Sequence, residues 1–224
     1  MVLLKDRERN TMEDNKKIYS FGAMLSRMKY IDRWALMRNS TKENISEHSL
    51  EVAMLAHLLS VIGRVRFGKE LDADRAALIG IYHDSTEILT GDMPTPIKYY
   101  SDEMRDTFKE IEDLAAKQLL DMLPDDIRAE YENLFFAQEK DIYLWKLVKA
   151  ADKISALIKC VEEEKAGNTE FANAKRMTRQ SIDSMELEEV TVFFEEFFPA
   201  YLKTLDELQE VLPAYNSQEL KKSK

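Results

Sequence analysis

Apolar side chains recur along most of this chain at the three- and four-residue spacing of amphipathic helices. Turn residues are scarce, because only six glycines and five prolines occur in 224 positions, far fewer than a chain of β-hairpins needs. The pattern therefore predicts an all-α protein. The expected helices span residues 18–30, 45–62, 75–89, 101–122, 125–136, 139–165, 170–185 and 188–212.

Local signals place some of the boundaries. Asn44 followed by Glu47 is typical of a capping box, which predicts that a helix begins at residue 45. Asp72 or Asp74 is the expected cap of the helix over 75–89. The segment 90–96 holds one glycine and two prolines, so we expect a loop there, directly after a helix that carries candidate site residues.

The periodic region predicts one domain over residues 18–212, because no repeat or linker interrupts it. Residues 1–17 are polar and unpatterned and are expected to form a flexible N-terminal arm. The Lys-rich segment 213–224 is expected to be a frayed C-terminal tail.

Composition narrows the class of partner. A formal charge of −10 repels phosphate backbones, so we expect no nucleic-acid polymer as a partner, and local cations must hold any phosphate substrate. No segment has the apolar length of a signal peptide or membrane span, which predicts a cytoplasmic protein without a membrane partner. The lone cysteine, Cys160, is consistent with a reducing compartment and is expected to be a small buried apolar residue.

The candidate chemistry begins with the histidines, of which the chain has three. On one continuous helix, His83, Asp84 and Glu87 would converge on one side, and His48 would lie in the first turn of its own helix. Imidazole and carboxylate together suit first-row divalent metals, and the absence of thiolates from the set argues against a structural zinc site. His57 lies nine residues after His48, nearly opposite on the helix, so we expect it to be packed or on the surface.

Asp152 interrupts an apolar stretch, where an unpaired carboxylate would be costly. A bound metal would remove that cost. A pairing with Lys149 or Lys153 would do so as well, and the helix alone does not decide between the two.

The order His48, His83, Asp84, Asp152 resembles the HD-domain metal-dependent phosphohydrolases. The match extends to segments typical of the bacterial 5′-deoxynucleotidases in that superfamily and covers roughly residues 21–208. These segments are IDRWALMRN at 31–39, ENISEHS at 43–49, YHDSTEILTGDMPTPIK at 82–98 and VKAAD at 148–152. One departure is Ala35, where some relatives carry proline.

The resemblance implies a compact multi-helix HD-domain fold, a homodimer, and hydrolysis of deoxyribonucleoside 5′-monophosphates to deoxyribonucleoside and phosphate. It implies a divalent transition metal such as Co²⁺, with Mn²⁺, Ni²⁺, Zn²⁺ or Cu²⁺ as alternatives. The metal ligands would be His48, His83, Asp84 and Asp152, with Glu87 as the acidic catalytic residue. The substrate-binding residues would be Arg33 for the phosphate, Trp34 against the 2′ position, Asp92 for the sugar, and Pro94 and Thr95 in the same loop.

Two other functions stay open. Another HD reaction, on a nucleoside triphosphate, a cyclic dinucleotide or a guanosine polyphosphate, would need more cations than Arg33, Arg38 and Lys98 near the motifs. A catalytically silent helical regulatory protein would not need Glu87 and Arg33 beside a complete ligand set. From the sequence alone, Trp34 also suits a core aromatic and Arg33 a solvated surface charge.

Overall fold

The computed structural model describes residues 17–98 and 100–210, with the backbone alone at 95, 96 and 210. Every regular element in this part of the chain is helical, which confirms the predicted all-α class. The predicted arm over residues 1–17 and tail over 213–224 lie outside the described residues, except for residue 17. The elements are α1 (Phe21–Leu25), η1 (Met28–Tyr30), α2 (Ile45–Phe67), α3 (Ala73–Tyr82), α4 (Glu87–Thr90), α5 (Thr95–Lys98), α6 (Asp102–Leu120), α7 (Asp125–Phe135), η2 (Glu139–Asp141), α8 (Ile142–Lys165), η3 (Thr169–Phe171), α9 (Ala172–Asp183), α10 (Glu188–Val192), η4 (Phe193–Phe197), η5 (Phe198–Leu202) and α11 (Leu205–Glu210).

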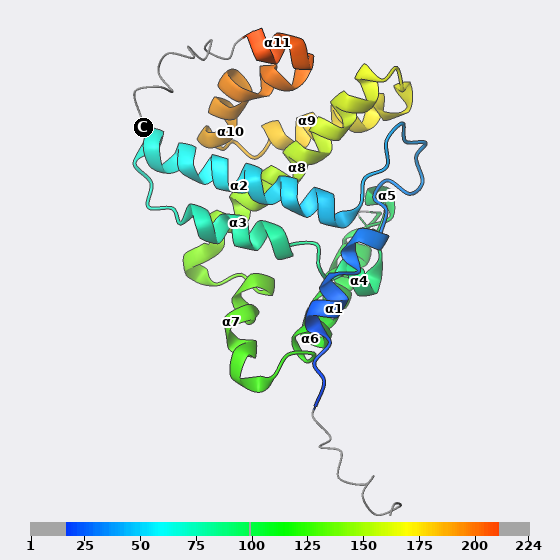
Figure 1. Cartoon of the computed structure of the whole chain (residues 1–224), viewed down its shortest axis with the longest axis vertical. Coiled ribbons are helices and arrows are strands. Elements are labelled where there is room, and N and C mark those ends of the chain that lie inside the picture. Colours follow the sequence, from blue (N-terminus) through cyan, green and yellow to red (C-terminus); the bar gives the residue numbers. More distant parts are fainter. Residues whose placement is uncertain (1–16, 99, 211–224) are drawn as a thin grey trace, which may run out of the picture.

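Helices α2, α3 and α8 pack against one another at the centre of the molecule (Figure 1). Helices α6 and α7 lie on the α3 side, whereas α9, α10 and α11 lie on the opposite side of α2. The apolar positions that predicted α2 are buried in the main core, together with residues of α3 and α8. None of the described helices combines the length and the apolar character needed to traverse a bilayer.

The start of α2 is fixed by its side chains. The Asn44 side chain accepts a hydrogen bond from the Glu47 backbone N–H at 3.1 Å, and the Glu47 carboxylate accepts one from the Asn44 N–H at 3.2 Å. The predicted capping box is therefore confirmed, and His48 lies in the first turn. The helix runs past the predicted end at residue 62 and stops at Gly68, whose φ of 66° is the left-handed conformation of a glycine cap.

The predicted helix over 75–89 is wrong in its second half. It begins at Ala73 with Asp72 as the cap but ends at Tyr82, and α4 starts only at Glu87. Within the intervening turn, the Ser85 hydroxyl and backbone N–H both donate to the Tyr82 carbonyl, at 2.7 and 3.0 Å. Because these bonds occupy the carbonyl that would continue the helix, His83 and Asp84 lie at a helix end rather than inside a helix.

Other boundaries shift for local reasons. The segment 18–30 forms two short helices, α1 and η1, and the expected loop over 90–96 already enters α5 at its end. The long helix predicted over 188–212 breaks into α10, η4, η5 and α11, and its last two residues lie outside the described range. Pro199 falls at the first turn of η5, where its missing N–H ends a regular helix.

The backbones of helices α2 and α3 lie close together at Gly80. A Cβ atom at this position would lie 2.8 Å from the Cα of Ala53 and 3.0 Å from its backbone nitrogen. Backbone atoms cannot move aside as a flexible side chain would. Only glycine therefore permits this spacing, three residues before His83.

We expect Gly80→Ala to lower the free energy of unfolding by about 1–3 kcal/mol, because the added methyl group forces α2 and α3 apart. Urea unfolding followed by circular dichroism measures the change. Gly22→Ala is the matched control, since a Cβ at Gly22 in α1 meets nothing within 4 Å. Equal stability of the two variants would contradict the steric interpretation.

Candidate metal centre and nucleotide site

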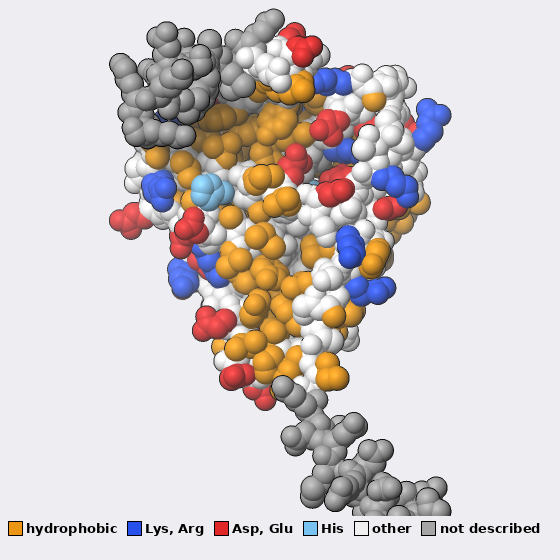
Figure 2. Space-filling view, in the orientation of Figure 1, with side chains coloured by type: hydrophobic (Ala, Val, Ile, Leu, Met, Phe, Trp, Pro, Cys, Tyr) orange, Lys and Arg blue, Asp and Glu red, His pale blue; other side chains and the backbone are white. Residues whose placement is uncertain are grey.

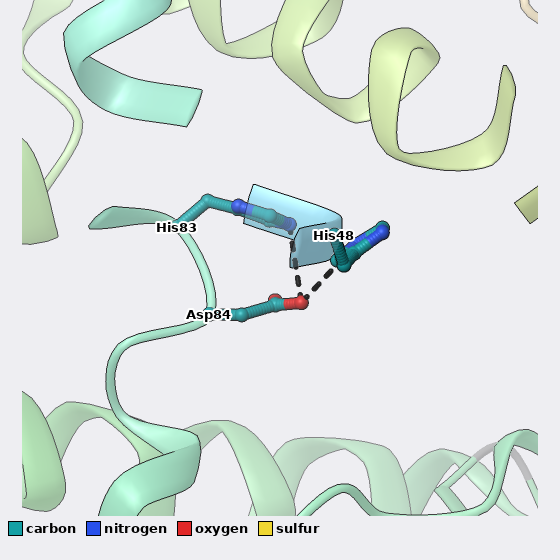
Figure 3. A group of neighbouring side chains, drawn as sticks. All are labelled: His48, His83 and Asp84. Atoms are coloured by element: carbon teal, nitrogen blue, oxygen red, sulfur yellow. Dashed lines mark ion pairs between the residues drawn. The ribbon is translucent and has the colours of Figure 1, made fainter. Parts of the chain in front are cut away.

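Three of the predicted ligands meet where α2 begins and α3 ends (Figure 3). One ligand atom each from His48, His83 and Asp84 lies within 4.8 Å of the others. The Oδ2 atom of Asp84 is 3.4 Å from His48 Nε2 and 3.2 Å from His83 Nε2. This arrangement of two imidazoles around one carboxylate is compatible with a bound cation.

His83 is oriented by the backbone. Its Nδ1 lies 2.8 Å from the Gly80 carbonyl oxygen, which only accepts hydrogen bonds, so Nδ1 carries the proton. In the neutral ring Nε2 then holds a free lone pair. Among the described residues this buried Nε2 has no hydrogen-bond partner, so its lone pair is available to a cation.

His48 is fully enclosed, and its Nε2 likewise lacks a hydrogen-bond partner in the described chain. Its Nδ1 lies 3.0 Å from the Ser155 hydroxyl oxygen, which donates to Glu51, so Nδ1–H can donate to Ser155. The same Nδ1 lies 2.7 Å from Arg33, whose guanidinium only donates. The two contacts require opposite tautomers, and only the one that faces Ser155 leaves Nε2 free for a cation.

Asp152, the fourth predicted ligand, approaches from α8. It is not part of the 4.8 Å set, but its Oδ1 lies 3.2 Å from His48 Nε2 and 4.0 Å from Arg33. Its ion pairs within the described chain are with these two residues and not with Lys149 or Lys153. Its side chain is 36% exposed, whereas that of His48 is 0% exposed, so Asp152 lies at the mouth of the site.

Burial and the neighbouring charges set the pKa values of His48, Asp84 and Asp152. Burial and Arg33 both act to lower the pKa of His48, but Asp152, Asp84 and Glu43 outweigh them and raise it well above its ordinary value. Burial alone would raise the pKa of Asp84, yet the two histidines hold it well below the usual range. The pKa of Asp152 is lowered in the same way, chiefly by His48.

Arg33 lies beside this cluster and is not the solvated surface charge that the sequence allowed. Its side chain is 12% exposed, and its NH1 donates to Glu43 Oε1 at 3.0 Å. Burial works against the charged form, but Glu43, Asp152 and Asp84 raise the pKa of Arg33. A buried, permanently charged fork beside a ligand cluster is suited to grip a phosphate.

Trp34 is held in a strained backbone conformation. Its φ of 58° lies in the left-handed region, which costs a residue with a side chain about 1–2 kcal/mol. Its backbone N–H donates to Asp92 Oδ2 at 3.2 Å, and its indole N–H donates to Glu43 Oε2 at 3.0 Å. The half-buried ring also packs edge-on against Phe171 at 5.3 Å, so several contacts offset the strain.

A buried carboxylate fixes the loop that follows Trp34. Glu163 of α8, only 1% exposed, accepts hydrogen bonds from the backbone N–H groups of Ser40 and Thr41, at 2.8 and 3.3 Å. Lys159 and Asn168 donate to the same carboxylate. Burial opposes the charge, but Lys159 and the other donors lower the pKa of Glu163 far below its usual value, so the group is ionised.

Glu87 opens α4 and presents a buried Oε2 with no hydrogen-bond partner among the described residues. Burial first, and then repulsion from Asp84 and Asp92, raises the pKa of Glu87 to about 9. The Asp92 pKa is raised by burial. Pro94 is half-buried just before α5, and the predicted contact of the Thr95 side chain lies outside what is described.

Sequence reasoning missed two residues that contact the predicted set, Glu43 and Ser155, and a third, Glu51, that bonds Ser155. Glu43 bonds Arg33 and Trp34, and the pair Ser155 and Glu51 continues the contacts of His48. The available signal was the position of Ser155, three residues beyond Asp152 on one helix. His57 is 46% exposed and pairs with Asp74 at 3.7 Å, which confirms a surface role.

The sequence and the fold are similar to those of known proteins. The 5′-deoxynucleotidase of Shewanella oneidensis is 44% identical over 190 residues, which cover 85% of this chain and 97% of that protein. An HD-domain phosphohydrolase from Listeria innocua has the same fold, with a TM-score of 0.71 at 22% identity over 85% of this chain and 92% of its own. A cyanophage S-2L HD phosphohydrolase bound to dA and one catalytic Zn²⁺ ion gives 0.57 at 18% identity, over 81% and 96%.

A family model described as 5′-deoxynucleotidase YfbR-like matches residues 20–201. This range contains all the residues of the ligand cluster and of the surrounding loop. The resemblance inferred from the motifs is thereby confirmed, and this chain belongs to the YfbR-like family of 5′-deoxynucleotidases.

Proposed function

We propose that this protein hydrolyses deoxyribonucleoside 5′-monophosphates to deoxyribonucleoside and phosphate. The observation that carries the proposal is an Arg33 side chain, only 12% exposed, directly beside the His48, His83 and Asp84 cluster. A cation site and a fixed guanidinium next to each other provide two positive groups for one phosphate. The family to which the chain belongs supports the same reaction.

We propose His48, His83, Asp84 and Asp152 as ligands of a divalent transition metal, with Co²⁺ first and Mn²⁺, Ni²⁺, Zn²⁺ or Cu²⁺ as alternatives. The orphaned Nε2 atoms of both histidines and the nearby carboxylates fit such an ion. When bound, the ion lowers the pKa of water and polarises a phosphate oxygen. Asp152 is 36% exposed, so the cluster is open to solvent on this side.

Arg33 is proposed to hold the phosphate. Its NH1 lies 2.7 Å from His48 Nδ1. When Nδ1 carries the proton and Nε2 is free for a cation, two donors face each other and this contact is unfavourable. Arg33 is then available to the substrate, where its planar fork balances charge on the phosphate oxygens as the 5′ oxygen leaves. Glu87 is proposed to hold or return a proton near that oxygen, because its free Oε2 is buried beside Asp84.

The sugar is proposed to lie between Trp34 and Asp92, which the structure joins by a hydrogen bond. Asp92 uses Oδ2 for the Trp34 backbone, which leaves its other oxygen free to accept from a 3′-hydroxyl. The indole, fixed at its N–H, would crowd a 2′-hydroxyl. Polyphosphate substrates fit less well, because Lys98 pairs with Glu112 at 2.7 Å and Arg38 is exposed.

We further propose a homodimer, with an apolar face on α2 and α3 as its interface. Figure 2 shows hydrophobic side chains gathered along the middle of the face that carries these helices. The four residues Leu50, Met54, Leu78 and Ile81 are 59%, 59%, 40% and 43% exposed. An exposed apolar patch on a packed helix pair is typical of a protein–protein interface.

A metal ion should raise the thermal unfolding midpoint of protein stripped with a chelator. An ion at a hundred times its dissociation constant stabilises by about 2.7 kcal/mol. His83→Ala should abolish the shift, whereas His57→Ala, a surface histidine outside the cluster, should keep it. Since a proton competes with the metal for His48, whose pKa is raised, the shift should shrink as the pH falls through that pKa. A shift that persists in His83→Ala would contradict the proposed ligands.

Phosphate release from a panel of deoxy- and ribonucleoside 5′-monophosphates, with each divalent metal restored after chelation, tests the activity. We expect orthophosphate from the deoxynucleotides. Glu87→Gln should lower kcat by about 100- to 10,000-fold while the metal-induced thermal shift remains. If no deoxynucleotide releases phosphate with any metal, the result contradicts the proposed function. Release of pyrophosphate from a nucleoside triphosphate would favour another HD reaction.

Light scattering should give about twice the chain mass of 26.1 kDa. Met54→Glu places a charge in the apolar face and should yield monomer, because burying an unpaired charge is costly. Met177→Glu on α9 is the control, since this exposed methionine lies on the opposite side of α2. A monomeric wild type would contradict the homodimer, and a dimeric Met54→Glu would place the interface elsewhere.

A further inference from the structure

Glu43 touches three different parts of the site and has no role in the reaction proposed above. One of its oxygens, Oε1, lies 3.0 Å from Arg33 NH1 and 3.4 Å from His48 Nδ1. The other, Oε2, accepts a hydrogen bond from the Trp34 indole N–H at 3.0 Å. The same carboxylate therefore joins the proposed phosphate ligand, the proposed sugar-facing ring and a proposed metal ligand.

The backbone also fixes Glu43. Its carbonyl oxygen accepts the Arg33 N–H at 2.9 Å, and the residue directly precedes Asn44, the cap of α2. Its side chain is 13% exposed, so little water competes with these contacts.

We propose that Glu43 is a positioning residue that sets the preference for deoxyribose over ribose. One Glu43 oxygen accepts from the Arg33 guanidinium and the other from the Trp34 indole. The carboxylate thereby fixes the distance between the group that binds the phosphate and the ring that faces the 2′ position. The indole excludes a 2′-hydroxyl only while the ring is held in place. This inference rests on the proposed function, because it assigns a cause to the specificity of the same site.

The chemistry of the carboxylate explains why glutamine cannot replace it. Both Arg33 NH1 and Trp34 Nε1 are donors, so each needs an acceptor. The amide of a glutamine presents one oxygen and one NH₂ group, which leaves one donor facing another. Glu43→Gln therefore loses one of the two anchors at nearly unchanged volume.

The test compares kcat/KM for 2′-deoxyadenosine and adenosine 5′-monophosphates. In Glu43→Gln we expect the ratio of kcat/KM for the deoxynucleotide to kcat/KM for the ribonucleotide to fall. It should approach the low ratio of Trp34→Ala, which lacks the indole altogether. The kcat/KM for the deoxynucleotide itself should fall about 10–100-fold, the usual effect of losing a residue that supports a binding group. Glu170→Gln is the matched control. Its carboxylate accepts the Arg38 N–H of the same loop at 3.1 Å, so the charge change is equal but Arg33 and Trp34 are untouched.

Tryptophan fluorescence gives a readout that does not depend on activity. In a Trp145→Phe background Trp34 is the only indole, and the described chain offers the Trp145 N–H no hydrogen bond to lose. We expect acrylamide to quench Trp34 more strongly in Glu43→Gln than in Glu170→Gln. If the wild type hydrolyses no deoxynucleotide, the proposed function fails, while the quenching still reports whether Glu43 anchors the indole.

Two results would overturn the inference. One is an unchanged deoxy-to-ribo ratio in a folded Glu43→Gln, whatever the quenching shows. The other is an equal fall of the ratio in Glu170→Gln, since this would assign the effect to the loop as a whole. If Glu43→Gln fails to fold by circular dichroism, Glu43→Asp replaces it. Aspartate keeps the charge beside Arg33 but is too short to reach both donors, so an intermediate ratio is expected.

Discussion

The close approach of α2 and α3 is the constraint on which the site depends. The two helices are antiparallel neighbours, so the first turn of α2 lies beside the last turn of α3. Gly80 allows their backbones to come together, and its carbonyl orients His83. His48 and His83 thus meet, with ring centroids 5.3 Å apart, because of backbone packing and not because of mutual attraction.

The same geometry concentrates charge in a small volume. Arg33 lies against Glu43 and near Asp152, and His48 lies among three carboxylates. Each buried cation therefore has acidic partners, as burial of charge requires. The buried Oε2 of Glu87 has no hydrogen-bond partner among the described residues, and burial first, then Asp84 and Asp92, raises the pKa of Glu87. A cation at the centre would reverse this balance, so the protonation of Glu87 and the occupancy of the cluster are linked.

Sequence reasoning predicted the helical class and the capping box, because these follow from local spacing, whereas the joining of His48 to His83 and Asp84 was expected from the family resemblance. It failed at the turn after Tyr82, where the Ser85 hydroxyl competes with helical hydrogen bonds inside an apolar pattern that continues to residue 89. Glu43 and Ser155 could not be predicted from the sequence, because their roles arise from contacts between residues that are separated in the chain. The places of Arg33 and Trp34 were expected from family resemblance alone, since neither has a spacing that distinguishes it from an ordinary loop residue.

The Glu163 carboxylate has a consequence for how binding is achieved. It ties the Ser40 and Thr41 amides to α8, the helix that also carries Asp152. The segment that presents Arg33 and Trp34 is therefore held after Trp34 by Glu163 and before Arg33 by Ile31, whose carbonyl accepts the Ile45 N–H at the start of α2. A pre-ordered segment loses little conformational entropy when a ligand arrives, so more of the contact energy remains as affinity. A nucleotide would then bind to a preformed site. Its shape would be selected without a rearrangement of this segment.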